Sequence, residues 1–139
     1  FKSGLFADLS YTYQEAEFED YVDSGVRLDG KRLPNVPEQL LGLIIGYQHP
    51  VWGQITVNAD YVGDRYFNKE NTLKGDDYWI LGTGFKKTFE KWDPQVSFFI
   101  DIKNLTDEEE VLIGDGSPGD EELKPVYGRG FLFGLELLF

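Results

Sequence analysis

The sequence predicts an all-β chain in which six long antiparallel strands form a meander that is part of a transmembrane β-barrel. Three observations support this fold class. Apolar and polar residues alternate with a period of two over six segments, as in strands with one apolar face. The connections between these segments are alternately long and short, and aromatic residues gather where the apolar zones end, as in barrels that cross a membrane.

Composition is compatible with such a barrel. Hydrophobic residues make up 41% of the 139 residues, but no apolar run reaches the length of about 18 residues that a transmembrane helix needs. The absence of Cys excludes disulfides and thiolate metal sites. A net charge of -12 argues against binding to nucleic acid, whose phosphates would be repelled.

Two strands are expected in the first third of the chain. The first covers residues 4–19, with an apolar zone about nine residues deep, which is enough for a tilted strand to cross a bilayer core. Its outward positions then become Glu15, Glu17 and Glu19, as though the strand continued into water. A polar connection at residues 20–37 leads to the second strand, residues 38–48.

Four more strands follow at residues 53–66, 76–88, 95–105 and 127–139. Short turns at residues 49–52 and 89–94 contain Pro, which cannot donate to a β-ladder. Longer connections at residues 67–75 and 106–125 are charged, and the acidic ones are interpreted mainly as solvated loops. Divalent cations that bridge these acids to lipopolysaccharide are the alternative interpretation.

The alternation assigns residues to two faces of the sheet. Residues expected to face the lumen are Asp8, Ser10, Thr12, Gln54, Asn58 and Asp60. Residues expected to face lipid are Leu41, Leu43, Ile45, Ile55, Val57, Phe98, Ile100, Phe131, Phe133 and Leu135. Aromatic residues expected near the membrane interfaces are Tyr11, Tyr13, Tyr47, Trp52, Tyr61, Trp79, Tyr127 and Phe139.

Five stretches together resemble the last part of the barrel of TonB-dependent outer-membrane receptors. They are residues 11–18, residues 30–38, residues 61–66, residues 102–107 and Gly128-Arg129 leading to Phe139. Gln39 departs from the family, which often has His there. The resemblance covers nearly the whole chain as the last six of about 22 strands. It implies a partial barrel, with the plug domain and the TonB box absent from residues 1–139.

The resemblance also implies a function. The chain would be the barrel portion of a receptor in the outer membrane of a Gram-negative bacterium, surrounded by lipid and lipopolysaccharide. This receptor would import a ferric siderophore or similar chelate, energised through TonB, and residues 32–34 and 111–115 resemble the siderophore and iron(III) dicitrate type. Loop cations expected to contact an anionic chelate are Arg27, Lys31, Arg32, Arg65 and Lys69.

The final strand resembles the closing strand of outer-membrane barrels. In such proteins this strand and its last aromatic residue are the signal that the barrel-assembly machinery reads. The residues of this signal are Phe133, Leu135, Leu137 and Phe139. Because single-chain outer-membrane barrels start at about eight strands, we expect the 139 residues to be a piece of a longer barrel.

No catalytic, metal or cofactor site is expected. The one histidine, His49, cannot form a triad or a His-rich metal site without a second one. The acidic run at residues 107–110 lacks the spacing of a calcium-binding loop. Two alternatives stay open, since alternation alone does not decide which face meets water. They are another outer-membrane barrel, such as a small porin, adhesin or barrel enzyme, and a soluble ligand-binding β-barrel.

Overall fold

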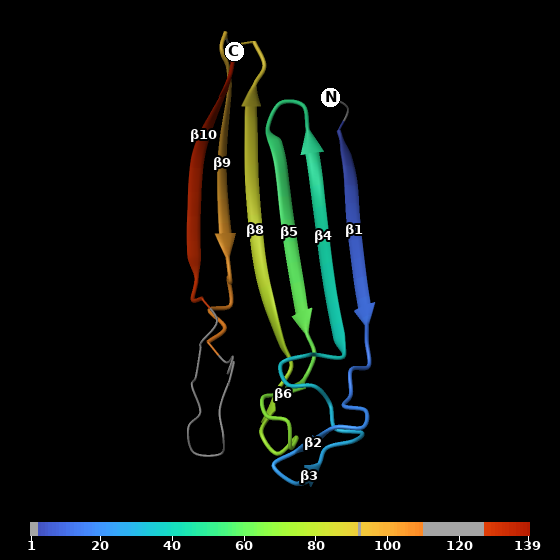
Figure 1. Cartoon of the computed structure of the whole chain (residues 1–139). Coiled ribbons are helices and arrows are strands. Elements are labelled where there is room, and N and C mark those ends of the chain that lie inside the picture. Colours follow the sequence, from blue (N-terminus) through green and yellow to red (C-terminus); the bar gives the residue numbers. More distant parts are fainter. Residues whose placement is uncertain (1–2, 92, 110–126) are drawn as a thin grey trace.

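A computed structural model describes residues 3–91, 93–109 and 127–139. Six long strands form one antiparallel sheet, in which each long strand pairs with the next along the chain (Figure 1). This order confirms the predicted meander. The strands are β1 (Gly4–Tyr13), β4 (Gln39–His49), β5 (Gly53–Val62), β8 (Tyr78–Phe89), β9 (Gln95–Lys103) and β10 (Gly130–Leu138).

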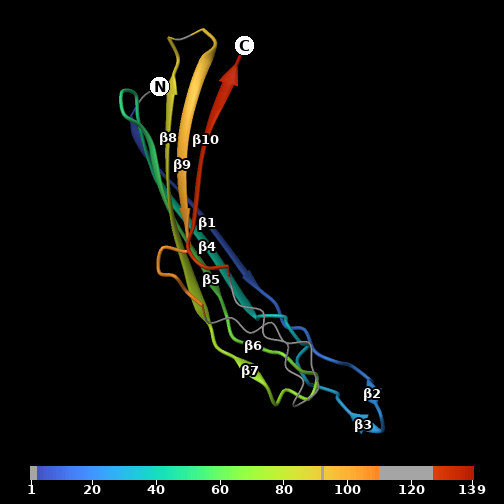
Figure 2. The same ribbon diagram turned by 90° about the vertical axis from the view of Figure 1, so that its left-hand side faces the viewer.

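The two ends of the sheet differ in their connections. The short turns β4–β5 and β8–β9 lie at one end, together with the start of β1 and the end of β10 (Figure 1). The longer connections lie at the other end and contain two small hairpins, β2 (Val22–Asp23) with β3 (Val26–Arg27) and β6 (Arg65–Tyr66) with β7 (Lys74–Gly75). Figure 2 shows that both hairpins extend beyond the sheet. Within the described residues, no helix is long and apolar enough to span a membrane.

The first strand is shorter than the sequence predicted. Residues 4–19 were expected to be extended, but β1 ends at Tyr13, and Glu17 makes only an isolated bridge to Arg32. The Gln14 N–H still donates to the Glu38 carbonyl at 2.9 Å. The next residue on the opposing segment is Pro37, which has no N–H, so the ladder cannot continue. The prediction that the strand runs on into water was therefore wrong.

The other strands also end early on the loop side. The strand expected over residues 53–66 ends at Val62, although the Gly63 N–H still donates to the Gln39 carbonyl at 2.8 Å, and the chain then turns into β6. The strands expected at residues 95–105 and 127–139 are confined to β9 and β10. The long strands are nine to twelve residues in length rather than eleven to sixteen. A length of about 9 to 11 residues is what a tilted membrane strand needs.

The register brings most of the large apolar residues of all six strands to one face, which we call the apolar face. One row of directly paired residues crosses the whole sheet and contains only apolar or aromatic side chains. Its members are Leu5, Tyr47, Ile55, Phe85, Ile100 and Phe133. The next row toward the loops has the same character apart from one threonine, and comprises Ala7, Ile45, Val57, Thr83, Ile102 and Phe131.

The opposite face, which we call the polar face, combines polar residues and glycines with fewer apolar side chains, among them Ile44 and Leu132. The ring of Phe6 lies over Gly46, where an added Cβ would be 2.1 Å from its Cζ atom. The ring of Phe99 lies over Gly134 in the same way, at 2.5 Å. An aromatic side chain that covers a glycine on the neighbouring strand fills the space that this glycine leaves. At these two places on the polar face, an aromatic ring therefore lies over the backbone of the neighbouring strand.

Hydrophobic burial is concentrated in the loops rather than in the sheet. Among the described residues, the buried hydrophobic side chains are Leu28 and Phe67, and both belong to the long connections. Among the described residues, no second layer covers either face of the sheet (Figure 2). Its apolar face is therefore open to whatever solvent surrounds it.

Candidate functional site

The apolar face is too large for the surface of an ordinary soluble protein. Large side chains on it are strongly exposed, among them Leu5 at 79% and Phe133 at 71%. Six strands spaced about 4.8 Å apart are about 24 Å wide, and the ten residue steps from Trp79 to Phe89 measure about 34 Å. The resulting area of ~800 Å² exceeds the largest apolar patch of typical soluble monomers, about 300 to 600 Å². Lipid is the solvent that such a face fits.

Aromatic side chains border the apolar face at both ends. At the loop end, Tyr11, Leu41, Tyr61 and Trp79 occupy one row, and the rings of Tyr61 and Trp79 are 4.9 Å apart. At the turn end, Tyr47 is followed by the exposed Trp52. This arrangement confirms the expected gathering of aromatics at the strand ends. Trp92 lies outside the described residues.

His49 organises the short turn that presents Trp52. Its Nδ1 atom accepts hydrogen bonds from the backbone N–H groups of Val51 and Trp52, at 3.1 and 3.2 Å. Its ring is 5.4 Å from the Trp52 ring, between centroids. The sequence had assigned His49 no role beyond a surface imidazole. The sequence feature that could have indicated this structural role is the position of His49 directly before Pro50 in a turn of four residues.

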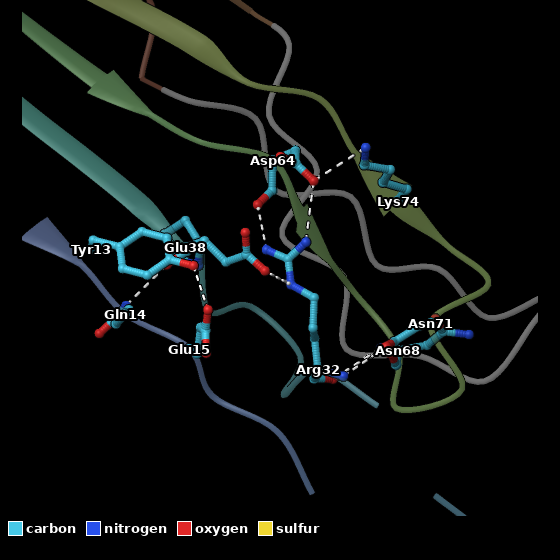
Figure 3. Close-up of polar contacts among 10 residues, drawn as sticks. Tyr13, Gln14, Glu15, Arg32, Glu38, Asp64, Asn68, Asn71 and Lys74 are labelled. Atoms are coloured by element: carbon cyan, nitrogen blue, oxygen red, sulfur yellow. Dashed lines mark hydrogen bonds and ion pairs between the residues drawn. The ribbon is translucent and has the colours of Figure 1, made fainter. Parts of the chain in front are cut away.

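At the loop end, charged side chains join the two long connections that the structure describes. Arg32 lies at the centre of this group, which we call the loop cluster. Its Nε atom is 3.1 Å from a Glu38 oxygen, and its Nη1 atom is 3.3 Å from Asp64 Oδ2 (Figure 3). Lys74 Nζ is 3.1 Å from the same Asp64 oxygen. The Tyr66 ring lies beside the Arg32 guanidinium, 5.4 Å from its centroid.

Asn71 and Asn68 complete the loop cluster. The Asn71 side chain binds the backbone of Arg32, and Asn71 itself adopts a positive φ of 57° (Figure 3). The buried Asn68 accepts hydrogen bonds from the N–H groups of Thr72 and Leu73 at 3.0 Å, which closes the β6–β7 loop. The sequence analysis missed both residues. Asn tolerates positive φ and mimics backbone partners, so two Asn residues in one short loop were the available signal.

The electrostatics of the loop cluster stabilise the charged form of Asp64. Burial by itself would raise the pKa of this carboxyl, but the hydrogen bonds and positive charges of Lys74 and Arg32 outweigh it and lower the pKa. The same hydrogen bond to Asp64 raises the pKa of Lys74. Asp64 and Lys74 therefore favour their charged forms, and the ion pairs of the cluster join the two loops.

Four of the five predicted loop cations have partners within the protein. Arg27 pairs with Asp29 at 2.5 Å and with Asp20 at 3.5 Å, while Arg32 belongs to the loop cluster. Lys69 pairs with Asp23 and lowers the pKa of that carboxyl. Arg65 is only 5% exposed, and its guanidinium contacts two aromatic rings. No carboxylate among the described residues pairs with Lys31, which is exposed.

Arg65 is buried at the point where β5 turns into the loop. Its guanidinium lies between the rings of Phe67 and Tyr78, 5.3 and 5.4 Å from their centroids. Its Nη1 atom has no hydrogen-bond partner among the described residues. Cation–π contacts of this kind hold Arg65 in the loop core and leave it out of reach of solvent.

The residues assigned to the lumen share the polar face. Asp8, Asn58 and Gly82 form one row, and Ser10 and Asp60 flank Gly42 in the next. Thr12 and Gln54 lie on the same face, because Thr12 is two residues from Ser10 on β1 and Gln54 is four residues from Asn58 on β5. The Lys86 ammonium on this face is 2.7 Å from Glu136, across the intervening strand β9.

The residues of the expected assembly signal lie in and just after β10. Phe133, Leu135 and Leu137 are on the apolar face, each opposite an apolar residue of β9. Phe139 follows the strand and is 97% exposed. In the part of the chain that the structure describes, no three His, Cys, Asp or Glu residues form a group that could hold a metal ion.

The long meander, its apolar face and the aromatic borders define the wall of a membrane β-barrel. Comparison with known protein families then identifies the kind of barrel. Residues 1–105 match the family described as TonB dependent receptor-like, beta-barrel, and the chain belongs to this family. Its members are outer-membrane receptors of Gram-negative bacteria that act as transporters rather than enzymes. The matched span includes all long strands except β10.

Proposed function

We propose that this chain forms part of the wall of an active-transport receptor that takes up a ferric siderophore or a similar chelate, energised through TonB. The observation that carries the proposal is the family match over residues 1–105 on a sheet with one continuous apolar face. The choice of an iron chelate as ligand rests on the resemblance of residues 32–34 and 111–115 to the siderophore and iron(III) dicitrate type of receptor. The outer membrane is the proposed location of the assembled receptor.

We further propose that residues 1–139 are the carboxyl-terminal segment of the barrel domain. β1 and β10 each have one hydrogen-bonded neighbour in the sheet of the described strands. Unpaired backbone groups are costly in lipid, so both edges require further strands of a closed barrel. A plug domain and a TonB-binding segment belong to the rest of the proposed receptor. In this proposal the barrel-assembly machinery recognises β10 and Phe139.

The loop cations divide into three groups in this proposal. Arg27, Arg32 and Lys69 already pair with carboxylates, and a ligand anion would have to displace these partners. Arg65 is buried between two rings. Lys31 is the exposed cation that pairs with no carboxylate among the described residues, so we assign contact with an anionic ligand first to Lys31.

Uptake of radiolabelled ferric chelates by cells that express the complete receptor tests the proposed function. A panel of siderophores and ferric citrate, compared in strains with and without TonB, should reveal one chelate whose uptake requires both the receptor and TonB. Lys31→Ala should weaken its binding to the receptor, whereas Lys91→Ala, in the turn at the opposite end, should not. Uptake that is unchanged without the receptor or without TonB for every chelate would contradict the proposal.

A further inference from the structure

Lys87 is a cation on the apolar face. In β8 it lies two residues from Phe85 and two from Phe89, and its direct partner on β9 is Phe98. Its Nζ atom bends toward the β4–β5 turn, where it donates to the Val51 carbonyl, and lies 5.7 Å from the centre of the Phe89 ring. No carboxylate among the described residues pairs with it. A long side chain that extends along an apolar surface toward its polar border is typical of a membrane interface.

A shallow pocket of about 360 Å³ lies beside this ammonium group, between the two short turns. Val51 and Phe89 supply apolar wall, while Lys87 and Lys91 bring positive charge and Glu90 one negative charge. The ammonium of Lys87 has three N–H donors, of which the Val51 carbonyl uses one. The pocket therefore combines an apolar wall with unused donors and a net positive charge.

The turn end is also the less acidic end of the chain. The three long connections, residues 14–38, 63–77 and 104–129, contain 19 of the 25 Asp and Glu residues but only 8 of the 13 Lys and Arg residues. The remaining strands and turns are therefore nearly neutral. Long-range repulsion of an anion is therefore weaker at the short turns than near the described connections of residues 14–38 and 63–77, which contain 11 Asp and Glu residues against 6 Lys and Arg residues.

Trp52 places this pocket at the level of lipid headgroups. It is 73% exposed, and His49 holds the turn that presents it beside Val51, which is 65% exposed. Tryptophan at the end of an apolar zone typically lies at the boundary between acyl chains and headgroups. The pocket adjoins the same turn, so its apolar wall continues the apolar face and its cations are at headgroup depth.

We propose that this pocket binds the headgroup of an anionic phospholipid. The phosphate oxygens accept hydrogen bonds from Lys87 and Lys91, and the upper part of the lipid lies against Val51 and Phe89. The apolar wall favours a membrane lipid over a free phosphate ion, since inorganic phosphate would leave that wall exposed to water. This inference rests on the membrane orientation in the proposed function and adds a binding site to it.

Lipid retention by the complete receptor tests the site. The receptor is reconstituted in equal amounts of phosphatidylglycerol and phosphatidylcholine, extracted into detergent, and analysed by native mass spectrometry for the lipid that stays bound. The wild-type receptor should retain phosphatidylglycerol several-fold over phosphatidylcholine. Lys87→Gln and Lys91→Gln should each reduce this preference several-fold. Lys87→Arg, which keeps the positive charge, should retain most of it.

Lys86→Gln is the matched control, because Lys86 precedes Lys87 but lies on the polar face with Glu136. It should keep the wild-type preference for phosphatidylglycerol. Equal retention of both lipids by the wild-type receptor, or an unchanged preference in Lys87→Gln, would overturn the site. Folding of each variant is verified by the heat-dependent electrophoretic shift of the barrel. A receptor that still imports its chelate but shows no lipid preference would disprove the lipid site alone.

Discussion

The carboxamide of Asn71 binds both backbone polar groups of Arg32, although the two residues are 39 positions apart in the sequence. Its Oδ1 atom accepts the Arg32 N–H at 2.7 Å, and its Nδ2 atom donates to the Arg32 carbonyl at 2.9 Å. One side chain thus replaces a strand partner for this residue. The side chain of Arg32 is then free to reach Glu38 and Asp64, so backbone and side chain of one residue join the two loops.

Removal of the Asn71 amide should loosen this contact. Asn71→Ala leaves a donor and an acceptor of Arg32 without partners, at a cost of about 1 to 3 kcal/mol. Hydrogen exchange of the amides in residues 29–38 should accelerate accordingly. Asn71→Gly separates the causes, because glycine accepts the positive φ of 57° but lacks the amide. Wild-type exchange in Asn71→Gly would mean that backbone conformation, rather than the hydrogen bonds, fixes the loop.

Acid should release the link between the loops. Because the folded-state pKa of Asp64 is lowered from 3.8, its contribution to stability is present above pH 3.8 and is lost as the pH falls through the folded value. Limited proteolysis of the loops, followed between pH 6 and pH 2 at roughly constant ionic strength, should show faster cleavage in this acidic range. Asp64→Asn should be cleaved faster at neutral pH and respond less to acid. An identical acid response in both proteins would exclude Asp64 as the cause.

The pKa of Lys74 gives the opposite dependence. Its folded-state value is raised above 10.5 by the hydrogen bond to Asp64. This contribution is therefore present below pH 10.5 and disappears as the pH rises through the folded value. The loop cluster is most stable between these two limits. In the same proteolysis assay at alkaline pH, a rise in pH should accelerate cleavage of the wild-type loops more than cleavage of the Lys74→Gln loops.

The two faces of β5 should respond differently to a charge. Val57 lies between Ile45 and Thr83 in a row that is otherwise apolar, whereas its neighbour Asn58 lies on the polar face beside Gly82. Val57→Arg should cost roughly 2 to 4 kcal/mol near the bilayer midplane, because the guanidinium would face lipid. Asn58→Arg should cost much less. Unfolding of the complete receptor from vesicles by urea measures both, and the reverse order would show that the faces are inverted.

The glycine under Phe6 should not accept a side chain. A Cβ at Gly46 would be 2.1 Å from the Phe6 ring, so Gly46→Ala must displace this ring, with a loss of about 1 to 3 kcal/mol from overpacking. Phe6→Ala alone exposes the glycine. The double variant should be more stable than the sum of the single effects predicts, since the alanine side chain then meets no ring. Strict additivity would show that the two residues do not interact.

The main strands could be predicted from the sequence because apolar side chains at every second position of a strand lie on one of its faces. Leu41, Val57 and Phe131 share the apolar face as expected. The strand ends at Tyr13 and Val62 were predicted too late, because β1 ends where the opposing segment has Pro37, which lacks an N–H, and β5 ends where its partner β4 begins at Gln39. Such terminations arise from the partner strand, and no local pattern reveals them.

The loop cluster was largely unpredictable for a related reason. Arg32 and Lys69 were recognised as loop cations, but their partners come from other segments, and alternation contains no information about long-range ion pairs. The small hairpins β2–β3 and β6–β7 are two residues per strand, which is too short for a periodic signal. The assignment of a chelate-binding role to the cations remains a prediction.

The isolated 139-residue chain should not behave as a soluble monomer. The outer edges of β1 and β10 present backbone groups without a neighbouring strand in the described sheet, and edges of this kind recruit other chains. At about 25 cal/mol per Å², burying an apolar face of ~800 Å² contributes up to about 20 kcal/mol to self-association. We expect the chain to aggregate without detergent and to transport nothing. A monodisperse, cooperatively melting monomer in detergent-free buffer, seen by sedimentation and calorimetry, would mean that the apolar face is covered by the chain itself and does not face lipid.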